Sequence, residues 1–283
     1  MAGTCASPLV SASPHSPPEI LFATDFSEVS RRALVCAKQI ARLRAAPLHT
    51  LHVVDLTNAA GGAPSTFSVA RDLAHRGLRH IQHELRLAGI AGSSTLIGGG
   101  SPAYAIQSAV VRYHPSLLVL GLESEHTMLA PALGPTIKSI LRSAACPVLV
   151  IGPHPPGHPG ARQPEALERA VFVTDTAPSS LEAALRAWPF IGNAPAPRLF
   201  AVLPPDSAPD FGFSADARQR FDCPRTLPFP GAAEELRAEI AGFHAGLVVF
   251  GIRSGGYLDS LSLAGLLSCT IIRSPCPVLV VRA

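Results

Sequence analysis

The chain contains an internal repeat, and no other feature of the sequence restricts its fold as strongly. Landmarks recur at fixed spacings: Thr24-Asp25 returns as Thr174-Asp175, 150 positions later, and Gly121 to Cys146 and Gly251 to Cys276 both span 25 positions. The interval from the aspartate to the glycine shortens from 96 positions in the first copy to 76 in the second. A chain of 283 residues has the length of about two domains. The sequence therefore predicts two tandem copies of one domain, the second with about twenty residues fewer in its middle.

Short apolar segments alternate with amphipathic ones in the first copy. The apolar segments are 20–24, 48–55, 94–99, 116–121 and 147–152, and the amphipathic ones are 28–44, 69–88, 103–113 and a stretch after Gly134. Apolar segments of this length are typical of strands buried on both faces of a parallel sheet. We therefore predict an α/β fold of two tandem doubly wound domains, each a mostly parallel five-stranded sheet flanked by helices.

Changes in composition mark the predicted domain boundaries. Residues 1–18 are rich in Ser, Pro and Ala and predict a flexible tail, whereas the Pro- and Gly-rich residues 154–167 predict a linker. This places the first domain at 19–153 and the second, shortened domain at 168–283. The apolar strands VLVIG and VLVVR end the two domains, and their mutual pairing would protect two otherwise exposed sheet edges.

Charge, hydropathy and cysteine usage exclude several functional classes. The net charge of +3 comes without a basic run, so neither nucleic acid nor an acidic membrane is an expected partner. The apolar runs are far shorter than the ~20 residues of a membrane span, and the N-terminus lacks the pattern of a signal peptide. The six cysteines show neither CxxC nor Cys/His ligand spacing, which favours reduced thiols in a cytoplasmic protein over disulfides or a metal site.

No residues form a recognisable catalytic constellation, because the sequence contains neither GxSxG nor a P-loop lysine. Cys146 and Cys276 precede prolines at equivalent places in the repeat, which favours small buried residues over redox partners. His49 and His52 lie on one predicted strand and should point to opposite faces, so they cannot form a metal pair. We expect a protein without catalytic residues.

Several segments resemble the universal stress protein family. They are ILFATDFSEVSRRALVCAKQIARLRAAPLHTLHVVD, GGGSPAYAI, SLLVLGLES and LRSAACPVLVIG in the first half, with AVFVTD and RSPCPVLVV in the second. The resemblance covers residues 19–152 well, and the second half mainly at its two ends. It implies an adenine-nucleotide alpha hydrolase-like fold, a role in stress survival, no general catalytic mechanism, and a tandem pseudo-dimer whose last strands pair.

The resemblance also implies where a nucleotide would bind, since some members of the family hold ATP. They use an aspartate after the first strand, a valine near the second, and a loop of the form G-x-x-G-x9-G-[S/T]. Thr24 and Asp25 match the first position, and Val53 or Val54 matches the second. Asp25 also has a structural interpretation, because an aspartate after a strand caps the next helix.

The loop of the family pattern is only half retained. Gly121 and Gly134 stand at the expected separation, but Ser124 replaces the middle glycine. Pro135 replaces the hydroxyl residue, with Thr136 one position later, and a proline removes a backbone N–H that could meet phosphate. Acidic residues in this loop oppose a polyanion unless Mg²⁺ intervenes. The second copy retains Asp175 and Gly251 but lacks the later glycines at the template positions.

These observations predict a stress-response or regulatory protein of the universal stress type that binds ATP with Mg²⁺ in its first domain only. The second domain is expected to be structural, as half of an intramolecular pseudo-dimer that can dimerise further. One alternative is a nucleotide-free scaffold that binds a protein partner. The other is a nucleotide-dependent transferase or hydrolase related to electron-transfer flavoproteins and nucleotidyltransferases.

Overall fold

A computed structural model describes residues 19–54, 64–122, 133–153, 167, 169–175, 177–191, 197–203, 219–228, 231–253 and 261–283. The strands are β1 (Ile20–Thr24), β2 (Leu48–Val54), β3 (Gly92–Gly98), β4 (Leu117–Gly121), β5 (Val148–Ile151), β6 (Ala170–Thr174), β7 (Arg198–Leu203), β8 (Asp222–Pro228), β9 (Leu247–Ile252) and β10 (Val278–Arg282). The helices are α1 (Glu28–Arg44), α2 (Pro64–Leu87), α3 (Pro102–Tyr113), α4 (Pro135–Ser143), α5 (Pro178–Leu185), α6 (Trp188–Ile191), α8 (Ala232–Gly242) and α9 (Leu261–Arg273). The predicted α/β fold is confirmed.

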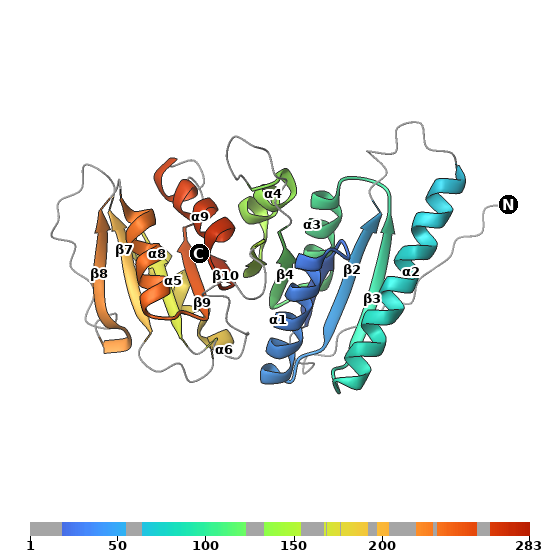
Figure 1. The fold of residues 1–283 in the computed structure, drawn as a ribbon, viewed down its shortest axis with the longest axis horizontal. Coiled ribbons are helices and arrows are strands. Elements are labelled where there is room, and N and C mark those ends of the chain that lie inside the picture. The colour runs from blue at the N-terminus through green and yellow to red at the C-terminus, as the bar shows by residue number, and fades with distance from the viewer. Residues whose placement is uncertain are drawn as a thin grey trace.

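All ten strands form one sheet, in the order β3-β2-β1-β4-β5-β10-β9-β6-β7-β8. The first five and the last five strands follow the same order, reflected about the middle of the sheet, and each set is parallel throughout. Figure 1 shows the two halves side by side, with β3 and β8 near the outer edges. Most of the predicted linker lies outside the described residues, so the domain boundaries remain a prediction.

The two halves meet where β5 pairs with β10, and this is the one antiparallel pairing among the described strands. Val278 lies opposite Val150, and Leu279 lies opposite Leu149. These side chains are almost completely buried. Pairing of the two last strands leaves neither of them as an open sheet edge, which is the arrangement expected from the sequence.

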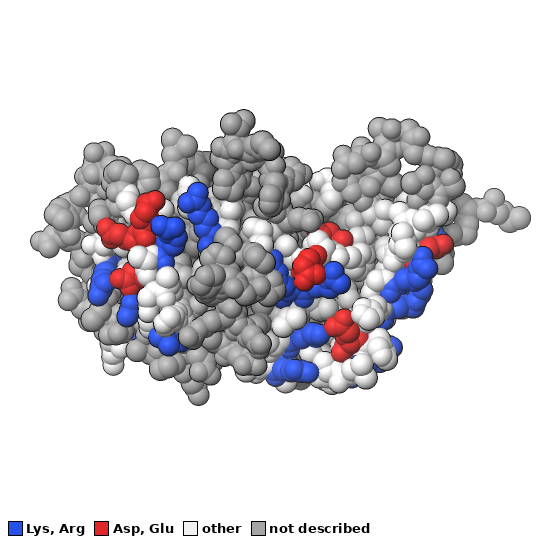
Figure 2. Space-filling view, viewed as in Figure 1, with Lys and Arg blue, Asp and Glu red and all other residues white. Residues whose placement is uncertain are grey.

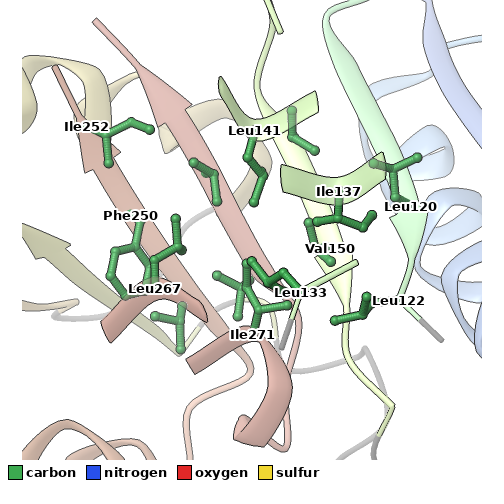
Figure 3. Packing of buried hydrophobic residues seen from close by; sticks show 14 of the residues in the cluster. Leu120, Leu122, Leu133, Ile137, Leu141, Val150, Phe250, Ile252, Leu267 and Ile271 are labelled. Atoms are coloured by element: carbon green, nitrogen blue, oxygen red, sulfur yellow. The ribbon is translucent and has the colours of Figure 1, made fainter. Parts of the chain in front are cut away.

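Helices cover both faces of the sheet, and each layer continues across both halves. Residues of α1, α2, α5 and α6 pack in one apolar cluster, and residues of α3, α4, α8 and α9 pack in the other. Figure 3 shows the second cluster at the junction, where Ile137 and Leu141 of α4 lie near Val150, and Leu267 and Ile271 of α9 approach from the other half. The two halves therefore share both hydrophobic cores.

Similar arginine contacts occur in both halves near the junction. Arg32 Nη2 donates to the Gly152 carbonyl at 3.1 Å, and Arg186 Nη1 donates to the Arg282 carbonyl at 3.2 Å. In each half, the first helix is thus tied to the end of the last strand. A Cβ on Gly152 would lie 2.3 Å from the Ile271 carbonyl oxygen. Glycine is therefore required at this close approach between the two halves.

Local signals account for most element boundaries. α1 spans the predicted residues 28–44, because Ser27 caps it: the Ser27 hydroxyl accepts from the Ser30 N–H at 3.1 Å. α2 begins at Pro64, five residues before the predicted start, and a proline suits the first turn of a helix. The two histidines of β2 point to opposite faces as predicted, since the His49 ring lies 4.5 Å from Tyr113 of α3 while His52 faces α1.

Candidate functional site

The predicted site residues gather at the carboxyl ends of three adjacent strands. Thr24 ends β1, Val54 ends β2 and Gly121 ends β4, and β1 lies between β2 and β4 in the sheet. The predicted residues at this edge are Thr24, Asp25, Val53, Val54 and Gly121. Three others, Gly134, Pro135 and Thr136, lie at the start of helix α4. Ser124 lies outside the described residues. Ligands of open parallel sheets bind at this edge, where neighbouring strands send their helices to opposite faces.

Asp25 is a charged residue at this edge, directly after β1. Its Oδ1 accepts from the Ser27 N–H at 2.9 Å and from the Ser30 hydroxyl. Burial acts to raise the pKa of Asp25, but the hydrogen bonds from Ser30 and Ser27 outweigh it and place the pKa below its ordinary value. No Lys, Arg or His side chain of the described residues lies within ion-pair distance of this carboxylate. Asp25 therefore orders the turn that leads into α1 and has no cationic partner in the described part of the chain.

Thr24 holds His52 in one tautomer, and the His52 ring lies beside Phe26. Its carbonyl oxygen lies 2.7 Å from His52 Nδ1, and a carbonyl can only accept, so the imidazole carries its proton on Nδ1 and leaves Nε2 as an acceptor. The pKa of His52 is lowered by burial, which exceeds the opposite effect of Thr24 and Asp25. The Phe26 ring lies 4.3 Å from the His52 ring, on a backbone with φ of +64°, a left-handed conformation uncommon for phenylalanine.

Val53 is the better placed of the two valines. Thr24 pairs with His52, so β2 extends past the end of β1 at the next residue. The Val54 carbonyl accepts from the Gly99 N–H at 3.0 Å and therefore points toward β3. Because successive residues of a strand turn their backbone groups to alternate sides, Val53 presents its N–H and C=O on the β1 side. In the register that pairs Thr24 with His52, the Val53 N–H meets the Thr24 carbonyl, and the Val53 carbonyl lies beyond the end of β1 with no strand partner among the described residues.

The two glycines of the predicted loop have different surroundings. A Cβ on Gly121 would lie 2.8 Å from the Ser30 nitrogen and 2.9 Å from the Val29 carbonyl carbon, so this glycine lets α1 pack directly on β4. Gly134 has φ of −61° as the N-cap of α4, and no atom of the described residues lies within 4 Å of its Cβ position. Gly121 is thus required by the fold, whereas Gly134 is open to whatever approaches the start of α4.

Residues 18–152 match the family model described as the universal stress protein family. The first half of the chain belongs to that family. A curated relative from Thermus aquaticus, "Universal stress protein in QAH/OAS sulfhydrylase 3'region", is 26% identical over 132 residues, which are 47% of this chain and 96% of the relative.

Solved structures extend the likeness of fold to the whole chain. A universal stress protein from Archaeoglobus fulgidus DSM 4304 is 18% identical, matches 93% of this chain and 98% of its own, and has a TM-score of 0.70. Another universal stress protein from Archaeoglobus fulgidus, described in complex with dAMP, is 22% identical over 47% of this chain and 95% of its own, with a TM-score of 0.36. Both halves of this chain therefore have the universal stress fold.

The second half of the chain carries a different pairing at its own carboxyl edge. Asp175 Oδ1 accepts from the Ala177 N–H at 2.9 Å, as Asp25 does from Ser27. Arg253 Nε lies 3.3 Å from Asp175 Oδ2, in an ion pair rather than an aligned hydrogen bond. The charge of the second aspartate is thereby balanced by Arg253, whereas Asp25 has no cationic partner among the residues that the structure describes.

A cavity of about 560 Å³ opens beside Asp25 in the first universal stress half, and sequence reasoning missed it. It is lined by residues of β1, β2, α1 and α2: Phe22, Thr24, Asp25, Phe26, Ser30, Arg31, Leu34, His52, Ala70, Leu73, Ala74, Gly77, His80, Ile81 and Glu84. The signal that could have revealed it is the helical spacing of small residues at 70, 74 and 77. No helix among the described residues combines the length and apolarity that crossing a bilayer requires.

Proposed function

We propose that the chain is a stress-response or regulatory protein that binds ATP with Mg²⁺ in its first half only. The observation that carries this proposal is the difference between Asp25 and Asp175. Asp25 is ionised and has no cationic partner among the described residues, while Asp175 is neutralised by Arg253. A nucleotide entering the second half would have to displace that arginine from the carboxylate.

In the first half, several of the predicted residues would have distinct roles. The Asp25 carboxylate would accept hydrogen bonds from the ribose hydroxyls, and the backbone of Val53 would contact the edge of the adenine. The phosphates would lie at the start of α4, where helix N–H groups point outward and favour anions. Pro135 offers no N–H there, so Thr136 would provide the first donor of the helix. Gly134 is half-buried, and no described atom lies within 4 Å of its Cβ position, which leaves room for the backbone to approach a phosphate.

The second half would act as the structural partner in an intramolecular pseudo-dimer with domains at 19–153 and 168–283. The pairing of β5 with β10 and the apolar clusters shared by both halves support this role. We place the protein in the cytoplasm, since Cys36, Cys146, Cys269 and Cys276 are free thiols. No catalytic step is assigned to the chain.

Calorimetric titration with ATP and Mg²⁺ tests this function. We expect one ATP per chain, about tenfold or more weaker binding for Asp25→Ala, and unchanged binding for the matched control Asp175→Ala. No heat at saturating ATP would remove the nucleotide and leave a scaffold that binds a protein partner. Two sites per chain, or equal effects of the two substitutions, would contradict the role given to Arg253.

A further inference from the structure

The cavity beside Asp25 extends away from the strand ends, along the groove between α1 and α2. Its floor is the buried Phe22 of β1, and its walls are Leu34 of α1 and Ile81 of α2. Small side chains on α2, among them the buried Ala74, keep the groove open. Such a concave, mostly apolar space of several hundred Å³ has the size of a site for a small molecule.

Phe26 bounds the groove at the end nearest the sheet edge. A Cβ on Gly77 would lie 2.7 Å from the Phe26 ring, so the ring packs directly on the backbone of α2. The ring also lies 4.3 Å from His52. Two aromatic rings and the Asp25 carboxylate therefore line the same end of the groove.

Most charges at the groove are already paired. Glu84 accepts from Lys38 at 2.8 Å and lies 3.2 Å from His80 Nε2. Arg31 is paired with Glu28 at 2.9 Å on the exposed surface of α1. Figure 2 shows basic and acidic side chains next to one another over α1 and α2. Asp25 is the charged group of the lining that has no charged partner among the described residues, so the groove carries one unbalanced negative charge.

Two side chains at that end are acceptors. Asp25 is an ionised acceptor, and His52 offers its Nε2 as an acceptor because Nδ1 donates to the Thr24 carbonyl. A ligand that engages both must bring donors to this end. A positive charge would satisfy both acceptors, balance the carboxylate and benefit from the aromatic ring of Phe26.

We propose that the groove between α1 and α2 binds a small amphipathic amine, with its apolar body between the helices and its ammonium group at Asp25. This site is distinct from the proposed phosphate site at the start of α4. Both would use Asp25, so an amine in the groove and ATP should compete. The net negative charge of the groove disfavours the polyphosphate itself as its occupant.

A head-group series on the unaltered protein tests the proposal. n-Octylamine, 1-octanol and octanoate carry an eight-carbon chain and differ in the charge of the head, the amine being protonated at pH 7 as a lysine is. Calorimetry should give the tightest binding for octylamine, about tenfold weaker binding for octanol, and the weakest for octanoate. Equal binding of the amine and the carboxylate, or no binding of the amine, would overturn the proposal.

Two substitutions separate the head and the body of the site. Asp25→Asn should bring octylamine to the affinity of octanol, whereas the control Asp72→Asn, which removes an exposed charge of α2 outside the groove, should leave the tenfold difference intact. Ala74→Phe should fill the groove and abolish octylamine binding while ATP binding persists, and the exposed control Ala238→Phe should abolish neither.

These readouts keep the two proposals apart. Octylamine binding without any heat from ATP would refute the nucleotide site alone, and the reverse would refute the groove alone. If Ala74→Phe does not fold, the head-group series and the two aspartate variants still decide the question. An undiminished preference for the amine in Asp25→Asn would refute the assignment of the head group.

Discussion

Gly121→Ala separates the two roles that a glycine at the end of β4 could have. The methyl group would lie 2.8 Å from the Ser30 nitrogen and 2.9 Å from the Val29 carbonyl carbon, and both atoms belong to the backbone of α1. A side chain could rotate away from such a contact, but a helix backbone cannot. Because nonbonded carbon atoms prefer about 3.5–4.0 Å, α1 would have to retreat from the sheet by roughly half an ångström or more.

The expected cost is about 2–4 kcal/mol of unfolding free energy, at the upper end of what overpacking usually costs, because the contact is between two backbones. Urea denaturation followed by circular dichroism measures it. Gly134→Ala is the matched control: its φ is −61° and no atom from the described part of the chain lies within 4 Å of the Cβ position, so its unfolding free energy should change by less than about 1 kcal/mol.

Binding should reverse the ranking of the two glycines. Gly134→Ala should weaken ATP binding, because the added methyl group occupies space at the start of α4 that a phosphate would approach. If Gly121→Ala were as stable as the unaltered protein, the close packing of α1 on β4 would be wrong. The separation of a folding glycine from a binding glycine would then fail with it.

Three further predictions concern the cap, the junction and a buried thiol. Ser30→Ala removes a hydrogen-bond donor to Asp25. The lowered pKa of Asp25 contributes stability that is present above the ordinary aspartate pKa and is lost as pH falls through the lowered pKa. Urea denaturation of the variant across pH should therefore show a loss of about 1 kcal/mol of unfolding free energy near pH 7 and progressively less in acid. Val150→Asp places an unpaired charge in the β5–β10 ladder and should cost about 3–5 kcal/mol and melt both halves together, whereas Leu43→Asp on the exposed face of α1 should change the melting temperature little. Burial raises the pKa of Cys36 to about 12, so this thiol should resist iodoacetamide at pH 8 in the native protein and react in urea, as mass spectrometry of the alkylated peptide would show.

The sequence predicted best the features that have local signals. α1 matched its predicted range because its cap and its apolar face lie within a few positions of one another. The pairing of β5 with β10 was also predictable, since two apolar strands that end repeated domains would otherwise both be edges. The start of α2 was missed, because residues from Pro64 onward lack the apolar periodicity that marks the rest of that helix.

Apart from that strand pairing, features that depend on packing between distant segments were not predictable. The cavity exists because of how α1 and α2 are spaced, which depends on contacts such as Phe26 against Gly77. Likewise, Gly121 matched the nucleotide-loop pattern of the family, and nothing in the sequence indicated that it is needed for the packing of α1 on β4. Arg253 could have been found, because it stands 130 positions after Glu123 in the repeat and reverses its charge, but its pairing with Asp175 requires β6 and β9 to be adjacent.

We propose that the two halves differ in nucleotide binding because Asp25 has no cationic partner among the described residues, whereas Asp175 is paired with Arg253. A crystal structure of the protein grown with ATP and Mg²⁺ tests it most directly. The account predicts one nucleotide per chain, with its ribose at Asp25, its adenine edge at the Val53 backbone and its phosphates at the start of α4. A nucleotide at Asp175, or one in the first half whose ribose lies away from Asp25, would contradict it.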